Sequence, residues 1–231
     1  MKKLPLLVGI ALCSLLAGVR AAELNSLSAE EKAAGWKLLF DGTTVTGWRS
    51  LSSEAPGEGW RAEGGALVRT GKAGDILTKG EFGDFELSIE WKISEGGNSG
   101  IIYRVGLGEP QTYHTGPEFQ VLDNVKGGDR FVENHRAGSL YDLIAAPKDV
   151  TKPAGEWNVA RLVVRGWKVQ HWLNGEKLVD TDLGSPEGRA MIAKSKFKEW
   201  PKFATLLRGR IALQDHNDGV SYRNIKIREL K

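Results

Sequence analysis

Cysteine is almost absent from this sequence of 231 residues, because the single one, Cys13, lies in an apolar segment near the N-terminus. We expect that segment to be removed from the mature protein, as argued below. The mature chain would then contain no cysteine, which excludes disulfide bonds and thiolate metal sites even in an oxidising compartment. Its stability must come from its apolar core.

The sequence also lacks an apolar run long enough to span a membrane. The longest, residues 4–16, is shorter than the about 20 residues that a bilayer requires. It follows two lysines and precedes small residues up to Ala21, which is the three-part pattern of a secretory signal peptide. We therefore expect residues 1–21 to be a signal, residues 22–231 to form one domain, and the protein to be periplasmic or secreted. Leu12 is too large for the position before a lipoprotein cysteine, so no lipid anchor is expected.

No excess of positive charge remains once that signal is removed. The full sequence has 32 Lys and Arg against 29 Asp and Glu, and Lys2, Lys3 and Arg20 belong to the signal. The mature chain thus carries 29 charges of each sign. Because nucleic acids and anionic membranes are bound through a basic excess, neither is expected as a partner.

Sustained helical periodicity is missing as well, and short alternating runs separated by Gly, Asn, Asp and Pro take its place. The clearest is 85–93, whose odd positions are apolar. Asn174-Gly175 predicts a hairpin, since both residues tolerate the positive φ of a type I′ turn. Short helices are expected over 28–35, with Ser28 as N-cap, and over 189–200. Further strands are expected at 99–105, 118–122, 139–144, 158–165, 168–173, 210–215 and 221–230. The pattern predicts an all-β sandwich or barrel.

Glu118 is the first candidate for chemistry. Strand alternation places Glu118 and Gln120 on one face, and Phe119 on the other. Asp123 joins that face only if a bulge shifts the register. Glu118 is either an ordinary exposed residue or a functional one, and the neighbouring amide and apolar alternation favour function.

Two histidines and one arginine lie on predicted strands. His171 alternates with apolar residues and points either into the core or towards a concave face, while His216 follows Gln214 on one face of its strand. Each is either a core histidine or a base or metal ligand. Arg104 ends an apolar strand, so it is either a clamp for a substrate oxygen or Glu118, or part of a structural ion pair.

Ordered motifs run through the mature chain. They include Gly35-Trp36-Lys37-Leu38-Leu39-Phe40-Asp41-Gly42, Gly97-Asn98-Ser99-Gly100, Glu118-Phe119-Gln120-Val121-Leu122-Asp123, Ala137-Gly138-Ser139-Leu140-Tyr141-Asp142, His171-Trp172-Leu173-Asn174-Gly175 and Gln214-Asp215-His216. Together they resemble the 3-keto-disaccharide hydrolase family. The loop after His216, residues 217–220, departs from the family pattern.

The resemblance implies a concanavalin A-like jelly-roll sandwich of two antiparallel sheets that cleaves glycosides oxidised at C3. The C2 proton of such a substrate is acidic and the C1 leaving group is β to the ketone, so removal of the proton, loss of the aglycone and addition of water give net hydrolysis. Related sandwich glycosidases carry Glu-x-Asp-x-x-Glu where this chain has Glu118-x-Gln120-x-x-Asp123, which argues against ordinary double displacement.

The expected site follows from these two arguments. The base is expected among Glu118, His171 and His216, with Arg104 as a further catalytic group. A divalent metal ion, held by Glu118 and His171, is the alternative to Arg104 as the positive charge. Substrate is expected to contact Asn98, Gln120, Asp123, His135, Tyr141 and Gln214. The competing interpretation is a non-catalytic, lectin-like carbohydrate-binding module, because this fold supports both functions.

Overall fold

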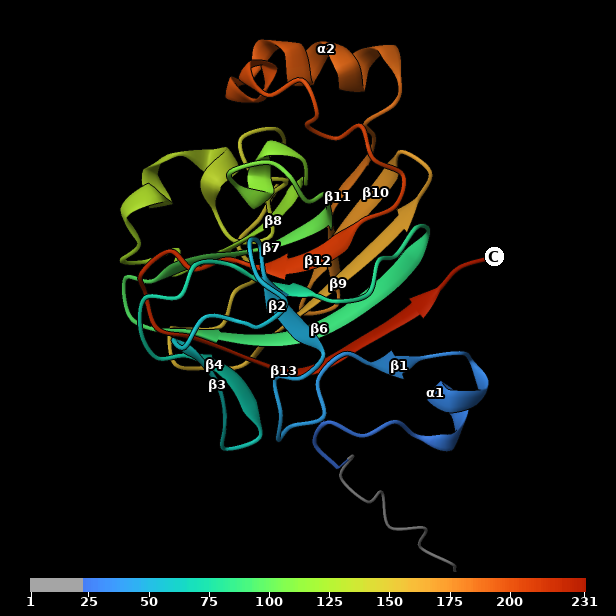
Figure 1. Ribbon diagram of the computed structural model, residues 1–231. Coiled ribbons are helices and arrows are strands. Elements are labelled where there is room, and N and C mark those ends of the chain that lie inside the picture. Colours follow the sequence, from blue (N-terminus) through green and yellow to red (C-terminus); the bar gives the residue numbers. More distant parts are fainter. Residues whose placement is uncertain (1–22) are drawn as a thin grey trace, which may run out of the picture.

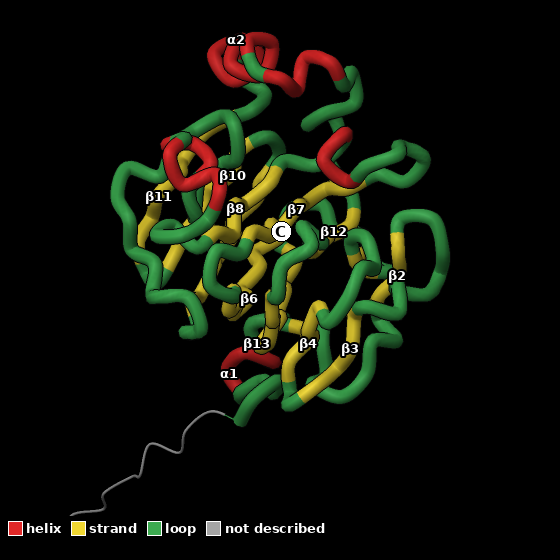
Figure 2. Tube along the Cα trace, turned by 90° about the vertical axis from the view of Figure 1, so that its left-hand side faces the viewer, coloured by secondary structure: helices red, strands yellow, loops and turns green. Residues whose placement is uncertain are grey.

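The computed structural model describes residues 23–231, so the expected signal, residues 1–21, lies outside the described residues. Two antiparallel sheets pack face to face, with short helices at opposite ends of the sandwich (Figures 1 and 2). This confirms the predicted jelly-roll sandwich. No helix within residues 23–231 is long and apolar enough to cross a membrane.

The larger sheet has eight strands. Its order is β11-β10-β9-β6-β13-β4-β3, and β1 pairs with β13. The strands are β1 (Lys37–Leu38), β3 (Trp60–Glu63), β4 (Ala66–Arg69), β6 (Phe85–Ile93), β9 (Asn158–Arg165), β10 (Lys168–Leu173), β11 (Glu176–Asp182) and β13 (Val220–Glu229). The odd positions of β6 are buried in the core, as its alternation predicts.

The smaller sheet has five strands in the order β2-β5-β12-β7-β8. They are β2 (Trp48–Ser50), β5 (Ile76–Thr78), β7 (Asn98–Val105), β8 (Glu118–Leu122) and β12 (Arg210–Leu213). On β8, Phe119 and Val121 belong to the core between the sheets. Because side chains alternate along a strand, Glu118 and Gln120 lie on the opposite face of this sheet, as expected.

Short helices precede and connect the strands. They are α1 (Ala29–Ala33), η1 (Thr112–His114), η2 (Gly128–Phe131), η3 (Glu133–His135), α2 (Pro186–Lys194) and η4 (Lys196–Glu199). Ser28 caps α1 and forms the predicted capping box with Glu31. The second predicted helix begins earlier than expected, because Ser185 caps α2 with Pro186 in its first turn, and it divides at Ser195 into α2 and η4.

One predicted hairpin is confirmed and one predicted strand is wrong. Asn174 and Gly175 have φ of 50° and 88° and join β10 to β11. Residues 139–144 form no strand; Leu140 makes only isolated bridges with Phe119 and Ile144. The left-handed backbone at Asp142, with φ of 58°, ends the extended path, so this segment becomes a turn against β8.

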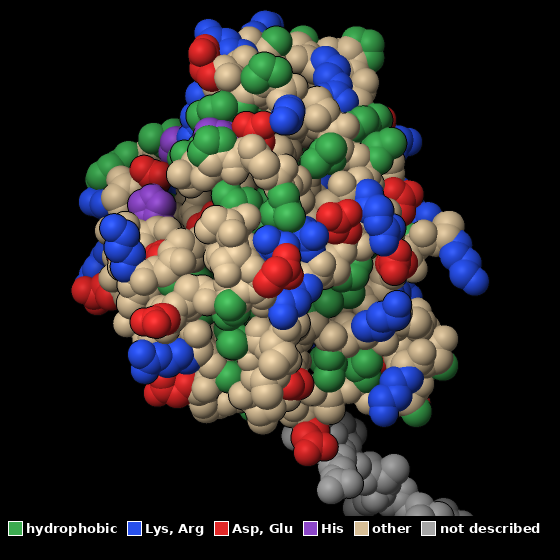
Figure 3. All heavy atoms as spheres, in the orientation of Figure 1, with side chains coloured by type: hydrophobic (Ala, Val, Ile, Leu, Met, Phe, Trp, Pro, Cys, Tyr) green, Lys and Arg blue, Asp and Glu red, His purple; other side chains and the backbone are tan. Residues whose placement is uncertain are grey.

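Charged side chains of both signs are interspersed over the face shown in Figure 3. Many form ion pairs on the outer face of the larger sheet, where Glu86 accepts from both Arg161 and Arg228. No broad basic surface is visible on this face.

Candidate active site

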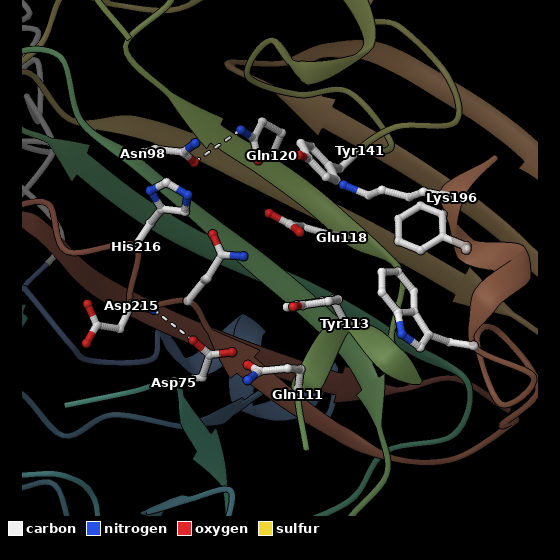
Figure 4. A pocket seen from close by; sticks show the side chains of 13 residues that line it. Asp75, Asn98, Gln111, Tyr113, Glu118, Gln120, Tyr141, Lys196, Asp215 and His216 are labelled. Carbon is white, nitrogen blue, oxygen red and sulfur yellow. Dashed lines mark hydrogen bonds between the residues drawn. The ribbon is translucent and has the colours of Figure 1, made fainter. Parts of the chain in front are cut away.

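A cavity of about 350 Å³ lies on the outer face of the smaller sheet, over β7, β8 and the end of β12. The segments that carry η1 and η4 close it from one side (Figure 4). Its lining residues are Asp75, Asn98, Gln111, Tyr113, Glu118, Gln120, Tyr141, Lys196, Phe197, Trp200, Gln214, Asp215 and His216.

Glu118 lies in the middle of this cavity and is only 4% exposed. Within residues 23–231 neither of its carboxyl oxygens forms a hydrogen bond. Burial, reinforced by the charge of Asp75, raises the pKa of Glu118 to about 8, and the ammonium group of Lys196 opposes the shift. The carboxyl group is therefore largely protonated at neutral pH and available to a ligand.

The amide pair beside Glu118 contains an unused acceptor. Gln120 Nε2 donates to Asn98 Oδ1 over 3.2 Å. The Oε1 atom of Gln120 is buried and has no hydrogen-bond partner among the described residues. A buried carbonyl oxygen without a partner is costly, so a ligand hydroxyl in the cavity is the natural donor to it.

The other two carboxylates of the cavity are occupied by structural contacts. Asp75 accepts from the hydroxyl of Thr112 and from the Asp215 amide, the latter over 2.9 Å. Asp215 accepts from Arg69 Nε over 2.6 Å and from the amides of residues 73 and 74 over 2.8 and 2.9 Å. These bonds join the 69–75 segment to the end of β12. Glu118 is thus the carboxyl group of the cavity that is left free for chemistry.

His216 follows β12 and faces the cavity from the polar side (Figure 4). Its Nδ1 atom lies 3.7 Å from Asp218 Oδ2. The same carboxylate oxygen accepts a hydrogen bond from the backbone N–H of Asn98 over 3.0 Å. About half of the His216 side chain is exposed. The imidazole is therefore accessible to solvent and to a ligand, with the Asp218 carboxylate beside it.

Aromatic side chains form the opposite side of the cavity. Tyr113 comes from η1, Phe197 from η4, and Trp200 directly follows η4. The Lys196 ammonium lies 4.2 Å from the centre of the Tyr141 ring and extends towards Glu118 in Figure 4. Lys196 is the one lysine among the residues that line the cavity, and its ammonium group brings a positive charge to it.

Six of the residues expected from sequence line this cavity and four do not. Those that line it are Glu118, His216, Asn98, Gln120, Tyr141 and Gln214; those that do not are His171, Arg104, Asp123 and His135. The lining residues that sequence reasoning missed are Asp75, Gln111, Tyr113, Lys196, Phe197, Trp200 and Asp215. Only Asp215 carried a signal, because it lies inside the Gln214-Asp215-His216 motif.

The expectation that His171 shares a face with Glu118 and His216 is wrong. His171 is fully buried, its Nε2 atom lies 3.2 Å from the Tyr103 hydroxyl, and its ring packs on Phe119. Phe119 is on the core face of β8, so the smaller sheet separates His171 from Glu118. Burial lowers the pKa of His171 to about 4, which keeps the imidazole neutral. Alternation with apolar residues here marks a core histidine.

Arg104 is a structural residue rather than a clamp in the cavity. Its guanidinium donates to the Gly166 carbonyl, to the Gly83 carbonyl over 3.1 Å and to Asp84 Oδ1 over 3.2 Å. The left-handed backbone of Arg104, with φ of 56°, interrupts strand alternation at this position. The side chain therefore joins the end of β7 to the loops at residues 83–84 and 166, and it does not line the cavity that contains Glu118.

Asp123 and His135 support the cavity from outside. Asp123 accepts from the backbone amides of Gly96 and Val125 over 2.8 and 2.9 Å, which fixes the turn after β8. The Nε2 atom of His135 lies 3.1 Å from Asp142 Oδ1, and its ring packs 4.3 Å from Tyr141. Both residues were expected to contact substrate, but neither lines the cavity. Each side chain instead stabilises a loop.

Glu118 and His171 do not fit a shared metal ion. They lie on opposite faces of the smaller sheet, and the His171 ring nitrogens face Tyr103 and Gly138. Within residues 23–231, no three or more His, Asp or Glu side chains are grouped to hold a metal. The predicted metal site at Glu118 and His171 is therefore wrong.

Comparison with known proteins places this chain among carbohydrate-active relatives. A protein of Bacteroides thetaiotaomicron named 3-keto-disaccharide hydrolase is 35% identical over 245 aligned positions, which cover 92% of this chain and 84% of the relative. A crystal structure of a proposed glycosyl hydrolase from Parabacteroides distasonis is 32% identical, with a TM-score of 0.86 over 90% of this chain and all of its own.

A more distant structure shares the fold alone. The carbohydrate-binding module CBM66 of Bacillus subtilis is 12% identical, with a TM-score of 0.53 over 81% of this chain and 98% of its own.

Residues 35–228 match the family described as the 3-keto-alpha-glucoside-1,2-lyase-like domain. From this match and the 35% identity to the Bacteroides relative, the chain belongs to the 3-keto-alpha-glucoside-1,2-lyase-like family.

Proposed function

We propose that this protein cleaves glycosides that carry a ketone at C3 of the glycone, by elimination across C1 and C2 followed by hydration. The observation that carries the proposal is Glu118, a buried carboxyl group with a raised pKa at the centre of a cavity lined by hydrogen-bonding groups. A simple binding module has no need to bury an ionisable group without a partner.

The substrate's own chemistry makes this route accessible. The C3 ketone acidifies the C2 proton, and C1, which carries the leaving oxygen, is the carbon β to that ketone. A base takes the C2 proton, the enolate expels the aglycone oxygen with a proton from an acid, and a C1–C2 double bond results. Addition of water across that bond returns the proton to C2 and a hydroxyl to C1, so the net reaction is hydrolysis.

Three side chains supply these roles in the proposal. His216 is the base for the C2 proton, since an imidazole accepts protons near neutral pH. Glu118 protonates the leaving oxygen and then, as a carboxylate, activates the water. Lys196 stabilises the negative charge that develops on the C3 oxygen, the part that the sequence suggested for Arg104.

The ordinary double-displacement mechanism fits this cavity less well. It needs a second carboxylate, free to attack or to activate water, opposite the acid. Asp75 and Asp215 are the other carboxylates in the lining, and both are engaged in structural hydrogen bonds. Elimination requires only one carboxyl group together with a base, and the cavity provides both.

The decisive experiment is NMR of a 3-keto-glucoside incubated with the protein in deuterated buffer. We expect cleavage with deuterium at C2 of the product, and no cleavage of the matching unoxidised glucoside. The isolated product, incubated without protein, controls for spontaneous exchange. Cleavage without deuterium at C2, or equal cleavage of the unoxidised glucoside, would overturn the elimination route. Binding of the 3-keto-glucoside without cleavage would favour the binding module.

Variants then assign the roles. His216→Ala should lower kcat roughly a hundredfold or more, as should Glu118→Gln. The matched control is Glu156→Gln, an exposed glutamate in a loop outside the cavity lining, which should leave turnover unchanged. Wild-type turnover by His216→Ala would remove His216 as the base.

A further inference from the structure

The cavity has two chemically different halves that meet at Glu118 (Figure 4). One half presents amides, carboxylates and imidazole, including Asn98, Gln120 and His216. The other half presents the rings of Tyr113 and Trp200 together with Phe197 and Tyr141. A ligand that spans the cavity therefore meets hydrogen-bonding groups at one end and ring faces at the other.

Trp200 dominates the aromatic half, and its surroundings determine which surface it presents. The His114 ring stacks on it with centroids 4.7 Å apart and planes 15° apart. Tyr113 stands at 71° to it, with centroids 5.2 Å apart. Since His114 occupies one face of the indole, a ligand contacts the opposite face or the edge, in a corner formed with Tyr113.

This corner is held in place by contacts that need no ligand. Phe197 is buried and stacks on Phe203 with centroids 3.8 Å apart. The segment that carries them is tied to the Tyr113 loop, because Lys202 pairs with Glu109 over 2.7 Å and the Ala204 amide donates to Thr115 over 2.8 Å. A rigid, partly exposed indole binds with little loss of side-chain entropy.

Core packing alone does not account for Trp200. Phe197 and Phe203 already close the core under this segment, at 2% and 3% exposure, whereas Trp200 remains half-buried and lines the cavity. Half-buried rings at the wall of a sugar site stack on the C–H face of a pyranose or on another aromatic ring.

We propose that Trp200 and Tyr113 form the leaving-group subsite and select aglycones that present a ring face. The 3-keto sugar, rich in oxygen atoms, occupies the polar half with its C3 oxygen turned towards the Lys196 ammonium, which extends from the aromatic side towards Glu118. Glu118, between the halves, reaches the glycosidic oxygen. This assignment rests on the proposed function. The shared chemistry of the aglycone is a ring with an apolar face, supplied either by a second hexose or by a phenyl group.

The test uses three substrates that share the 3-keto-glucosyl group and differ in the aglycone: methyl, phenyl and glucosyl. The ratio of kcat/KM between wild type and each variant is compared for each substrate, because that ratio cancels differences in leaving-group reactivity. Trp200→Ala should lose roughly tenfold or more on the phenyl and glucosyl substrates, mainly through KM, and less than about threefold on the methyl substrate.

Two further variants separate ring contact from structure. Trp200→Phe keeps a ring and should recover a large part of the loss. Trp172 is a half-buried tryptophan on β10 that packs against Arg161 of β9 and does not line the cavity. Trp172→Ala should therefore change none of the three ratios. A loss confined to the phenyl or to the glucosyl substrate identifies which ring the subsite accepts.

An equal loss of kcat/KM by Trp200→Ala on all three substrates would overturn the subsite while leaving the proposed function intact. If wild type cleaves none of them, the proposed function fails, and titration calorimetry of the same three compounds decides the subsite. Tighter binding of the two ring aglycones by wild type, lost in Trp200→Ala, upholds it; equal binding by both proteins rejects it.

Discussion

The carboxyl group of Glu118 lies against the backbone of Gly100, across the β7–β8 pair. A β-carbon added at residue 100 would stand 2.7 Å from Glu118 Cδ, which is closer than real Cβ contacts allow. Residue 100 pairs with Gln120 and lies between Asn98 and Ile102 on β7. The Glu118 carboxyl group therefore occupies the space that a side chain at residue 100 would fill.

Gly100→Ala should displace Glu118 and reduce kcat/KM by roughly 10-fold to 100-fold, because small displacements of a catalytic group are costly. The melting temperature should fall by only a few degrees, since the side chain that moves faces the cavity rather than the core. The matched control is Gly128→Ala, where an added Cβ meets nothing within 4 Å. Unchanged kcat/KM in Gly100→Ala would show that the position of Glu118 is not critical.

Glu118 should destabilise the folded protein at alkaline pH. Its folded pKa of about 8 lies above the ordinary value of 4.5, so the folded state binds the proton more tightly than the unfolded state between these values. The free energy of unfolding therefore decreases as pH rises through this window. Glu118→Gln should be the more stable protein at pH 8.5, by roughly 1–4 kcal/mol, and the advantage should shrink towards pH 5.

Urea unfolding of both proteins at the two pH values measures this difference. Glu156→Gln, in which the replaced glutamate is exposed, should show no such trend. A constant difference between wild type and Glu118→Gln at the two pH values would mean that the pKa of Glu118 is not raised by folding.

Lys196, and not Arg104, should supply the positive charge of the cavity. Lys196 lowers the pKa of Glu118, so Lys196→Met should raise that pKa and move the alkaline limb of kcat/KM to higher pH, while lowering kcat. Arg104→Met breaks three structural hydrogen bonds and should cost about 2–3 kcal/mol of stability without moving the limb. A shift of the limb in Arg104→Met alone would reverse this assignment.

His171 should affect stability and leave catalysis nearly unchanged. Its folded pKa of about 4 lies below the ordinary 6.5, so the unfolded state binds more protons between these values. The free energy of unfolding therefore falls as pH drops from about 6.5 to 4, and is fully present above that window. His171→Gln should flatten this dependence, with kcat/KM within about threefold of wild type at pH 7. A hundredfold loss of kcat/KM in a folded variant would return His171 to the catalytic site.

Local pattern alone determined much of the scaffold. The alternation of 85–93 predicts β6, Asn174-Gly175 predicts the hairpin, and Ser28 with Glu31 predicts the capped helix, because each depends on contacts between residues close in sequence. The same reasoning placed Glu118 and Gln120 together, since two residues two apart on a strand share a face. The strand predicted at residues 139–144 was wrong, because the alternation of side chains gives no indication of the left-handed backbone at Asp142.

Only the tertiary structure decided which face of each strand becomes a site. Alternation groups His171 with apolar neighbours, but whether that face meets the other sheet or solvent depends on how the sheets pack. The aromatic wall was beyond sequence reasoning for a related reason: Tyr113 and Trp200 are far apart in the chain and lie outside the strands, and loop contacts alone bring them together. Sequence thus specified the strands and the face that carries Glu118, while long-range packing selected the residues that surround it.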